Sequence, residues 1–107
     1  MAVGEPVRVG QTVQFHLVDR ESAHQDLLAM LTRLRVRLAN QRPKFGIYVN
    51  DAGRGQALHG VPHHDVALIR EVLGDFPLAG FFSRAELAPQ KDVNLMHQYA
   101  GVLTVFA

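Results

Sequence analysis

The sequence contains no cysteine among its 107 residues. A disulfide-stabilised scaffold, a cysteine nucleophile and a zinc site with cysteine ligands are therefore excluded. No apolar run approaches the roughly 18 residues of a transmembrane helix, and Met1–Pro6 lacks the basic-then-apolar order of a signal peptide. We therefore expect a cytoplasmic protein with no membrane contact.

The charges of the chain are nearly balanced. A net charge of +1 and a pI of about 8.3 give no bulk electrostatic attraction to nucleic acid or to an anionic membrane. One basic cluster is formed by Arg33, Arg35, Arg37, Arg42 and Lys44. Because no aromatic residues are interleaved with these charges, we interpret the cluster as a solvated face and expect no nucleic-acid partner.

The composition is that of one folded domain. Hydrophobic residues make up 48% of the chain and charged residues 20%, which is ordinary for a globular protein. We therefore treat residues 1–107 as a single domain with an extended lead-in over residues 1–10. Gly10 and Gln11 predict a turn at the end of this lead-in.

Two elements are predicted in the first part of the chain. Alternating apolar and polar residues predict a half-exposed strand over residues 12–18. Leucines at positions i, i+4, i+7 and i+11 predict a helix that begins within residues 19–22 and runs to about residue 40. Ser22 and Gln25 have the spacing of a capping box, so we expect Ser22 to cap this helix.

Four further elements complete the order β-α-β-α-β-β. They are a strand over residues 45–49, a helix over 63–73, and strands over 78–82 and 100–106. This order predicts an α/β (α+β) fold, a mixed sheet with two helices packed on it, in which helical crossovers join parallel strands. We expect the last strand to pair with its predecessor through a hairpin-like connection. That strand is apolar on both faces, so another domain or subunit is expected to cover the second face of the sheet.

A glycine-rich loop after the second strand is the strongest candidate for a binding site. Asp51 stops the strand, and Gly53, Arg54 and Gly55 open a loop that continues to Gly60. The loop matches neither the P-loop nor the G-x-G-x-x-G pattern, so nucleotide binding by either mechanism is unsupported. Two interpretations stay open: a turn with a solvated Arg54, or a loop whose amides and arginine bind a carboxylate or another anion.

Histidines follow this loop, but their spacing does not predict a metal site. His59 and His63 are four residues apart, yet Pro62 interrupts any helix that would place them on one face. Asp65 is explained as a first-turn carboxylate that complements the helix dipole. We therefore predict no metal and no cofactor.

A second loop over residues 83–89 is flanked by a possible acid–base pair, Glu86 and His97. Neither a nucleophile nor a Ser-His-Asp arrangement accompanies them. An enzyme that uses Glu86 and His97 is therefore kept only as an alternative.

The order of these motifs resembles the C-terminal domain of the FIST family. The residues that carry the resemblance are Gly53-Arg54-Gly55 with Leu58 and Gly60, Pro62 with His64-Asp65, the segment PLAGFFSRAELAP over 77–89, and Asn94-Leu95-Met96-His97. The resemblance implies a sensory module that binds a small ligand, with amino acids as proposed ligands. It also implies an N-terminal partner half, which we expect to lie outside this chain.

The function expected from the sequence is therefore a non-enzymatic sensory or regulatory domain in signal transduction. Its ligand, an amino acid or small carboxylate, is expected between residues 50–60 and 83–89. The predicted ligand-binding residues are Asp51, Gly53, Arg54, Gly55, His64, Arg84, Glu86 and His97. Arg54→Ala is expected to weaken binding without unfolding the domain. The alternatives are a protein-interaction or self-assembly module that forms homo-oligomers through its apolar sheet face, and the enzyme described above.

Overall fold

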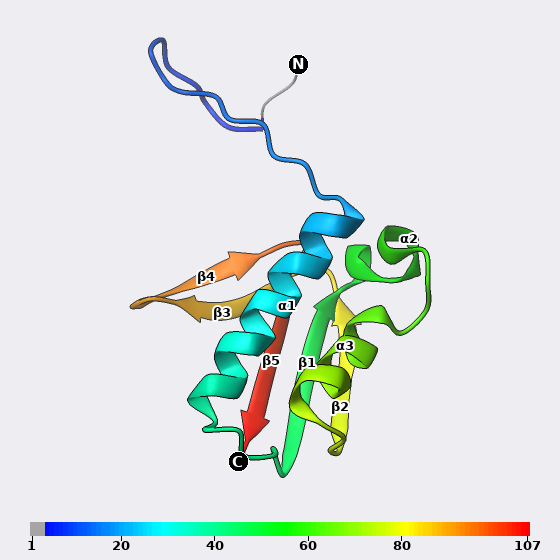
Figure 1. Cartoon of the computed structure of the whole chain (residues 1–107). Helices are drawn as coiled ribbons and strands as arrows, with labels where there is room; N and C mark the ends of the chain where they lie inside the picture. Colours follow the sequence, from blue (N-terminus) through cyan, green and yellow to red (C-terminus); the bar gives the residue numbers. More distant parts are fainter. Residues whose placement is uncertain (1–3) are drawn as a thin grey trace.

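The computed structural model describes residues 4–107 and consists of a three-stranded sheet, a separate hairpin and helices on one sheet face (Figure 1). The elements are α1 (Arg20–Arg37), β1 (Phe45–Asp51), the 3-10 turn η1 (Ala52–Arg54), α2 (Gln56–His59), α3 (His64–Leu73), β2 (Leu78–Ser83), β3 (Glu86–Gln90), β4 (Val93–His97) and β5 (Gly101–Phe106). This confirms the predicted fold class. Within residues 4–107 no helix combines the length and apolar character needed to cross a bilayer.

The strand β1 is the centre of the sheet, whose order is β2-β1-β5. It runs parallel to β2, with Gly46 opposite Leu78, because α3 returns the chain to the end of the sheet where β1 began. It runs antiparallel to β5, with Phe45 opposite Phe106. The expected pairing of β5 with β2 is therefore wrong.

The segment between β2 and β5 explains this correction. We expected a loop there, but β3 and β4 form an antiparallel hairpin in which Glu86 lies opposite His97. The hairpin projects to one side of the sheet and brings the chain back at the free edge of β1 (Figure 1). The connection is long enough to pass the end of β1, so β5 does not have to fold directly against β2.

The strand expected over residues 12–18 does not form. These residues precede α1 as an extended arm that leads away from the body of the domain (Figure 1), and they are almost entirely exposed. A strand needs a neighbouring strand to satisfy its backbone groups, and no described strand pairs with this arm. The turn at Gly10 is confirmed, because Gly10 has a φ of +91° and the Gln11 amide donates to the Arg8 carbonyl at 3.2 Å.

The helix α1 begins at a cap different from the one expected. Asp19 is the N-cap, and its carboxylate accepts from both the backbone N–H and the hydroxyl of Ser22, each at 2.9 Å. Gln25 bonds instead to Glu21, so no Ser22–Gln25 capping box forms. A carboxylate one turn earlier competes successfully for the free amides because it also complements the helix dipole.

The cap makes the stability of α1 depend on pH. The bonds from Ser22 hold the pKa of Asp19 below its ordinary value of 3.8. Because the folded-state pKa is depressed, the stabilisation is present above pH 3.8 and is lost as the pH falls through the lower folded value. We expect Asp19→Ala to lower Tm by a few degrees at pH 7, and by less at pH 3. Asp26→Ala, an exposed change on the same helix, is the control in thermal melts.

The core lies between the helices and one face of the sheet. Its buried members are Leu27, Leu31, Tyr48, Leu68, Ile69, Leu73 and Phe76. The predicted leucine stripe of α1 is confirmed, since Leu27 and Leu31 are buried and the next two leucines pack against the cluster. The helix itself ends at Arg37 rather than near residue 40.

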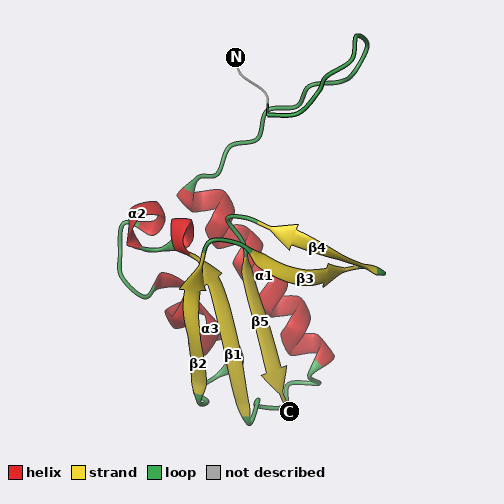
Figure 2. Ribbon diagram, turned by 180° about the vertical axis from the view of Figure 1, so that it is seen from behind, coloured by secondary structure: helices red, strands yellow, loops and turns green. Residues whose placement is uncertain are grey.

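The other face of the sheet is not covered by the described residues. Figure 2 shows the three strands from this side, with α1 and α3 behind them. Phe45, Ile47 and Phe106 are each 43% exposed, and Phe81 on the edge strand is 65% exposed. The rings of Phe45 and Phe106 stack with a centroid separation of 4.3 Å. We call these four side chains the open apolar face.

Candidate functional site

A pocket of about 440 Å³ lies between β2 and the segment that contains α2 and the start of α3. Apolar side chains along its walls include Val61, Pro62, Val66, Leu78 and Phe82. Polar side chains gather at its base, namely Tyr48, Asn50, Arg54, His59, His64 and Asp65. The pocket therefore offers apolar contact on its sides and hydrogen bonding at its base.

The segment after β1 is more ordered than a glycine-rich loop. It forms η1 and α2 before Gly60 ends α2 with a φ of +75°, a left-handed conformation that glycine adopts without strain. The chain reverses through Pro62, and α3 starts at His64. This reversal stacks the rings of His59 and His64 at a centroid separation of 3.8 Å. The break at Pro62, which was expected to separate the histidines, brings two of them together.

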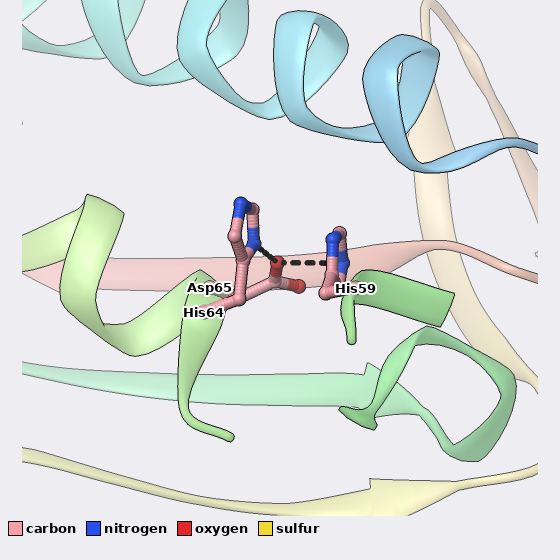
Figure 3. Close-up of side chains that lie close together, drawn as sticks. All are labelled: His59, His64 and Asp65. Carbon is pink, nitrogen blue, oxygen red and sulfur yellow. Dashed lines mark hydrogen bonds and ion pairs between the residues drawn. The ribbon is translucent and has the colours of Figure 1, made fainter. Parts of the chain in front are cut away.

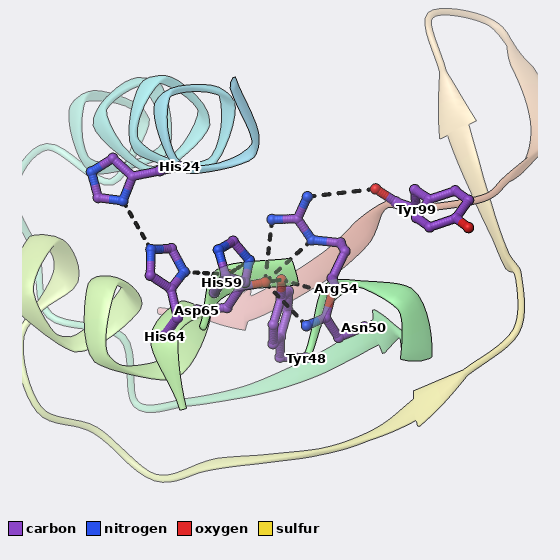
Figure 4. Close-up of polar contacts among 8 residues, drawn as sticks. All are labelled: His24, Tyr48, Asn50, Arg54, His59, His64, Asp65 and Tyr99. Carbon is purple, nitrogen blue, oxygen red and sulfur yellow. Dashed lines mark hydrogen bonds and ion pairs between the residues drawn. The ribbon is translucent and has the colours of Figure 1, made fainter. Parts of the chain in front are cut away.

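Asp65 is the centre of the polar network at the base (Figure 4). Its Oδ2 accepts from the Tyr48 hydroxyl at 2.7 Å and from the Asn50 amide at 3.0 Å. The same oxygen lies 3.3 Å from both Nε and Nη2 of Arg54. Asp65 does lie in the first turn of α3, as predicted, but it is 4% exposed and its main contacts are with β1 and η1.

The second oxygen of Asp65 faces the two stacked histidines. Oδ1 lies 2.8 Å from His64 Nδ1 and 3.2 Å from His59 Nε2. His64 Nε2 in turn contacts Nδ1 of His24 on α1 at 2.9 Å. The chain Asp65–His64–His24 therefore connects the base of the pocket to the first helix.

His59 is buried without a hydrogen bond. It is 2% exposed, and neither ring nitrogen has a well-aligned hydrogen-bond partner among residues 4–107. Its Nε2 lies 3.2 Å from Oδ1 of Asp65, but the two atoms are not aligned for a hydrogen bond. A buried polar group in this state needs an explanation, such as a bound molecule or ion.

The protonation states follow from burial and from these contacts. Burial raises the pKa of Asp65, but the bonds from His64 and Tyr48 and the charge of Arg54 outweigh it, so the pKa is lowered and the carboxylate stays ionised. Burial and the charge of Asp65 raise the pKa of Tyr48, which keeps its proton and donates it. Burial lowers the pKa of His59, which favours the neutral imidazole.

The structure places three of the residues predicted from the sequence in the pocket: Arg54, Gly55 and His64. Asp51 and Gly53 lie beside it and connect chain segments. Oδ1 of Asp51 accepts from the Gly53 amide at 2.7 Å, and Oδ2 accepts from the amide of Tyr99 at 3.0 Å. These two bonds attach the end of β1 to the connection that leads into β5.

The other three predicted residues do not line the pocket. Arg84 is exposed. Glu86 is 3% exposed, and its Oε1 accepts from the Ser83 hydroxyl at 2.6 Å. His97 lies opposite Glu86 in the hairpin and contacts the Ala88 carbonyl at 3.3 Å. Residues 50–60 therefore contribute to this pocket, whereas none of residues 83–89 lines it.

The sequence patterns did not predict that Tyr48, Asn50 and His24 belong to the network. They also did not predict that Asp65 is buried at its centre. Tyr48 and Asn50 could have been predicted from the strand pattern. They occupy alternate positions of β1, so their side chains lie on the same buried face of the strand. Polar residues at core-facing positions of a central strand need buried partners. Nothing in the local sequence indicated His24.

A comparison with protein-family models identifies the family of this domain. The model of the FIST C domain matches residues 1–89 of the chain. The chain belongs to the FIST C domain family. The match confirms the resemblance found in the sequence over residues 1–89, whereas Asn94-Leu95-Met96-His97 lie outside it. FIST C domains are a sensory-type family.

The curated relatives are mycobacterial and uncharacterised. An uncharacterised protein of Mycobacterium tuberculosis strain H37Rv is 36% identical over 106 residues, which cover 99% of this chain and 27% of the relative. An uncharacterised protein of Mycobacterium bovis is 36% identical over 104 residues, which cover 97% of this chain and 27% of that relative. This chain thus spans about a quarter of the length of these relatives. No solved structure matches it.

Proposed function

We propose that this FIST C domain is a non-enzymatic sensory or regulatory domain that binds a small polar or anionic molecule in the pocket between β2 and α2–α3. The observation that carries the proposal is the pocket itself, with apolar walls and a polar base. Small-molecule sites have this character, with volumes of roughly 300–1,000 Å³. The pocket also adjoins the parallel pair β1 and β2, and open sheets commonly bind ligands near the carboxyl ends of such strands.

An amino acid or a small carboxylate fits the chemistry of this pocket. Arg54 uses Nε and Nη2 on Asp65, while its Nη1 makes only a 3.5 Å contact with the Tyr99 carbonyl. Nη1 therefore keeps donor capacity for a carboxylate. The apolar part of such a ligand would lie against the walls near Phe82. The residues that line the pocket include no serine, threonine or cysteine, which favours binding over nucleophilic catalysis.

Phe82 provides a test that leaves the polar network intact. In buffer containing EDTA, we expect a member of a panel of amino acids and small carboxylates to raise Tm by several degrees. Ligand at 100 times its Kd adds about 2.7 kcal/mol to the stability. Phe82→Ala removes a wall of the pocket and should weaken binding at least tenfold by calorimetry.

Phe106→Ala is the matched control, because Phe106 is an exposed phenylalanine on the open apolar face and does not line the pocket. It should leave the affinity unchanged. A panel with no active compound, or equal losses in the two variants, would contradict the proposal.

The open apolar face favours a second candidate function, self-association of this domain. Three half-exposed side chains lie on adjacent β1 and β5, and Phe81 extends the surface across β2. Apolar surface of this kind, contiguous over three strands, is typical of interfaces. We expect wild-type protein to form dimers in sedimentation experiments at high concentration, and Ile47→Lys to shift them towards monomers. A wild-type protein that stays monomeric at every concentration would exclude this candidate.

A further inference from the structure

Three potential metal ligands from two helices converge at the base of the pocket. Nε2 of His59, at the end of α2, and Nδ1 of His64, at the start of α3, both face Oδ1 of Asp65 (Figure 3). The three atoms all lie within 4.8 Å of one another. Two imidazole nitrogens and one carboxylate oxygen form a ligand set typical of zinc and related divalent ions.

The distances between these atoms suit a shared ion. Two ligand atoms bound at about 2.1 Å to one ion are roughly 3.0 Å apart at a right angle and roughly 3.4 Å apart at the tetrahedral angle. The observed separations are 2.8 Å from His64 to Asp65 and 3.2 Å from His59 to Asp65. The two imidazole rings are stacked with 9° between their planes, so one ring has to rotate before both nitrogens point at one ion between them.

The burial of His59 is an independent observation that points to a ligand. Its ring is 2% exposed, and neither nitrogen has a hydrogen-bond partner among the described residues. Nε2 lies 3.2 Å from Oδ1 of Asp65 without being aligned for a hydrogen bond to it. An ion at this point would satisfy a nitrogen that the surrounding side chains leave unsatisfied.

The residues around the three ligands hold them in position. Oδ2 of Asp65 is fixed by Tyr48 and Asn50, which leaves Oδ1 to face the histidines. Nε2 of His64 is held by His24, so Nδ1 is directed inwards. Outer partners of this kind orient the ligands in metal sites. Arg54 places a positive charge on the far oxygen of Asp65, so we expect weaker affinity than in a closed structural zinc site.

We propose that His59, His64 and Asp65 bind one divalent transition-metal ion, of which Zn²⁺ is the best match. Three protein ligands leave at least one coordination position open. All three line the pocket, so the open position faces the space that the small ligand would occupy. A carboxylate ligand could then coordinate the ion directly. The metal site goes beyond the small-ligand proposal and does not depend on it.

Titration with metal alone tests the site. Protein freed of metal with EDTA and then dialysed is titrated with Zn²⁺ by calorimetry and with Co²⁺ by visible absorption. We expect one equivalent to bind, with d–d bands of a four- or five-coordinate Co²⁺ centre. His59→Gln and His64→Gln should each weaken binding at least tenfold. His63→Asn, an exposed neighbour outside the ligand set, should bind as wild type does.

A variant that fails to fold would also lose metal binding, so a second measurement uses the wild-type protein. In ¹⁵N-labelled protein, saturating Zn²⁺ should shift Nε2 of His59 and Nδ1 of His64 to the values of metal-bound nitrogens. Absence of stoichiometric binding, unchanged ring nitrogens, or loss of binding in His63→Asn alone would overturn the proposal. The two proposals are tested separately. The ligand panel is run in EDTA, which removes free metal, so its outcome does not depend on metal binding. The metal titration is run without the small ligand and is interpreted on its own.

Discussion

Asp65→Ala is expected to lower the free energy of unfolding by about 3–5 kcal/mol, the range for breaking a buried ion pair from one side. The change would leave the guanidinium of Arg54, which is 8% exposed, without its counter-charge. It would also remove the acceptor for Tyr48 and Asn50, whose side chains are buried. Urea denaturation of the metal-free protein measures the difference.

Asp75→Ala is the control for this prediction. Asp75 pairs with Arg70 at 3.5 Å, but its side chain is 85% exposed, so its loss should change stability by less than about 1 kcal/mol. Arg54→Ala should be destabilising like Asp65→Ala, and the double variant should lose less than the sum of the two. This revises the expectation from sequence that Arg54→Ala would spare the fold. If Asp65→Ala is no more harmful than Asp75→Ala, the network does not hold the pocket together.

Leu31→Ala is the second change with a large expected effect, a loss of about 2–5 kcal/mol. Leu31 is fully buried in α1, where it belongs to the cluster that joins this helix to α3 and the sheet. Truncation removes apolar contacts and leaves a cavity that rigid neighbours on three elements cannot close. Because α1 also carries His24, loosening it should weaken the contact with His64.

Val36→Ala is the matched control on the same helix. Val36 is 72% exposed, so its truncation should alter stability by less than about 0.5 kcal/mol. Thermal and urea unfolding of both variants provide the comparison. Equal effects from the two substitutions would show that α1 is not packed on the sheet as described.

The elements that the sequence predicted well are those stabilised by their own periodic pattern. The leucine stripe of α1 and the amphipathic α3 each bury one side against the same core, to which β1 contributes Tyr48 and β2 the partly buried Leu78. Hydrophobic periodicity is sufficient to place such segments because burial determines which side turns inwards. The fold class was predicted from these segments together with β5, which is apolar on both faces.

The errors arose where pairing partners decide the structure. The arm over residues 12–18 has a strand pattern, but no described strand lies beside it. The hairpin β3–β4 was taken for a loop because Pro89 and polar residues interrupt its pattern. A proline is tolerated there because an isolated two-stranded hairpin consists only of edge strands. Neither outcome can be decided from local propensity.

Only part of the candidate pocket could be predicted from the sequence. The segment after β1 does line the pocket, but Asp65 becomes its centre through Tyr48 and Asn50, which lie on a different element. The pairing of His59 with His64 depends on the reversal at Pro62, a feature that a helical spacing rule treats as an interruption. Both features depend on tertiary structure, so motif spacing alone could not predict them.

Mapping of amide chemical shifts on the full chain is the most direct test of the central claim, that the pocket between β2 and α2–α3 is the binding site. Spectra of ¹⁵N-labelled protein are recorded with each compound that raises Tm, in EDTA and again with Zn²⁺. The account predicts that the largest shifts fall on residues 54–66 and 78–82, with little change at Arg84, Glu86 and His97. Shifts confined to the hairpin or to the open apolar face would contradict it.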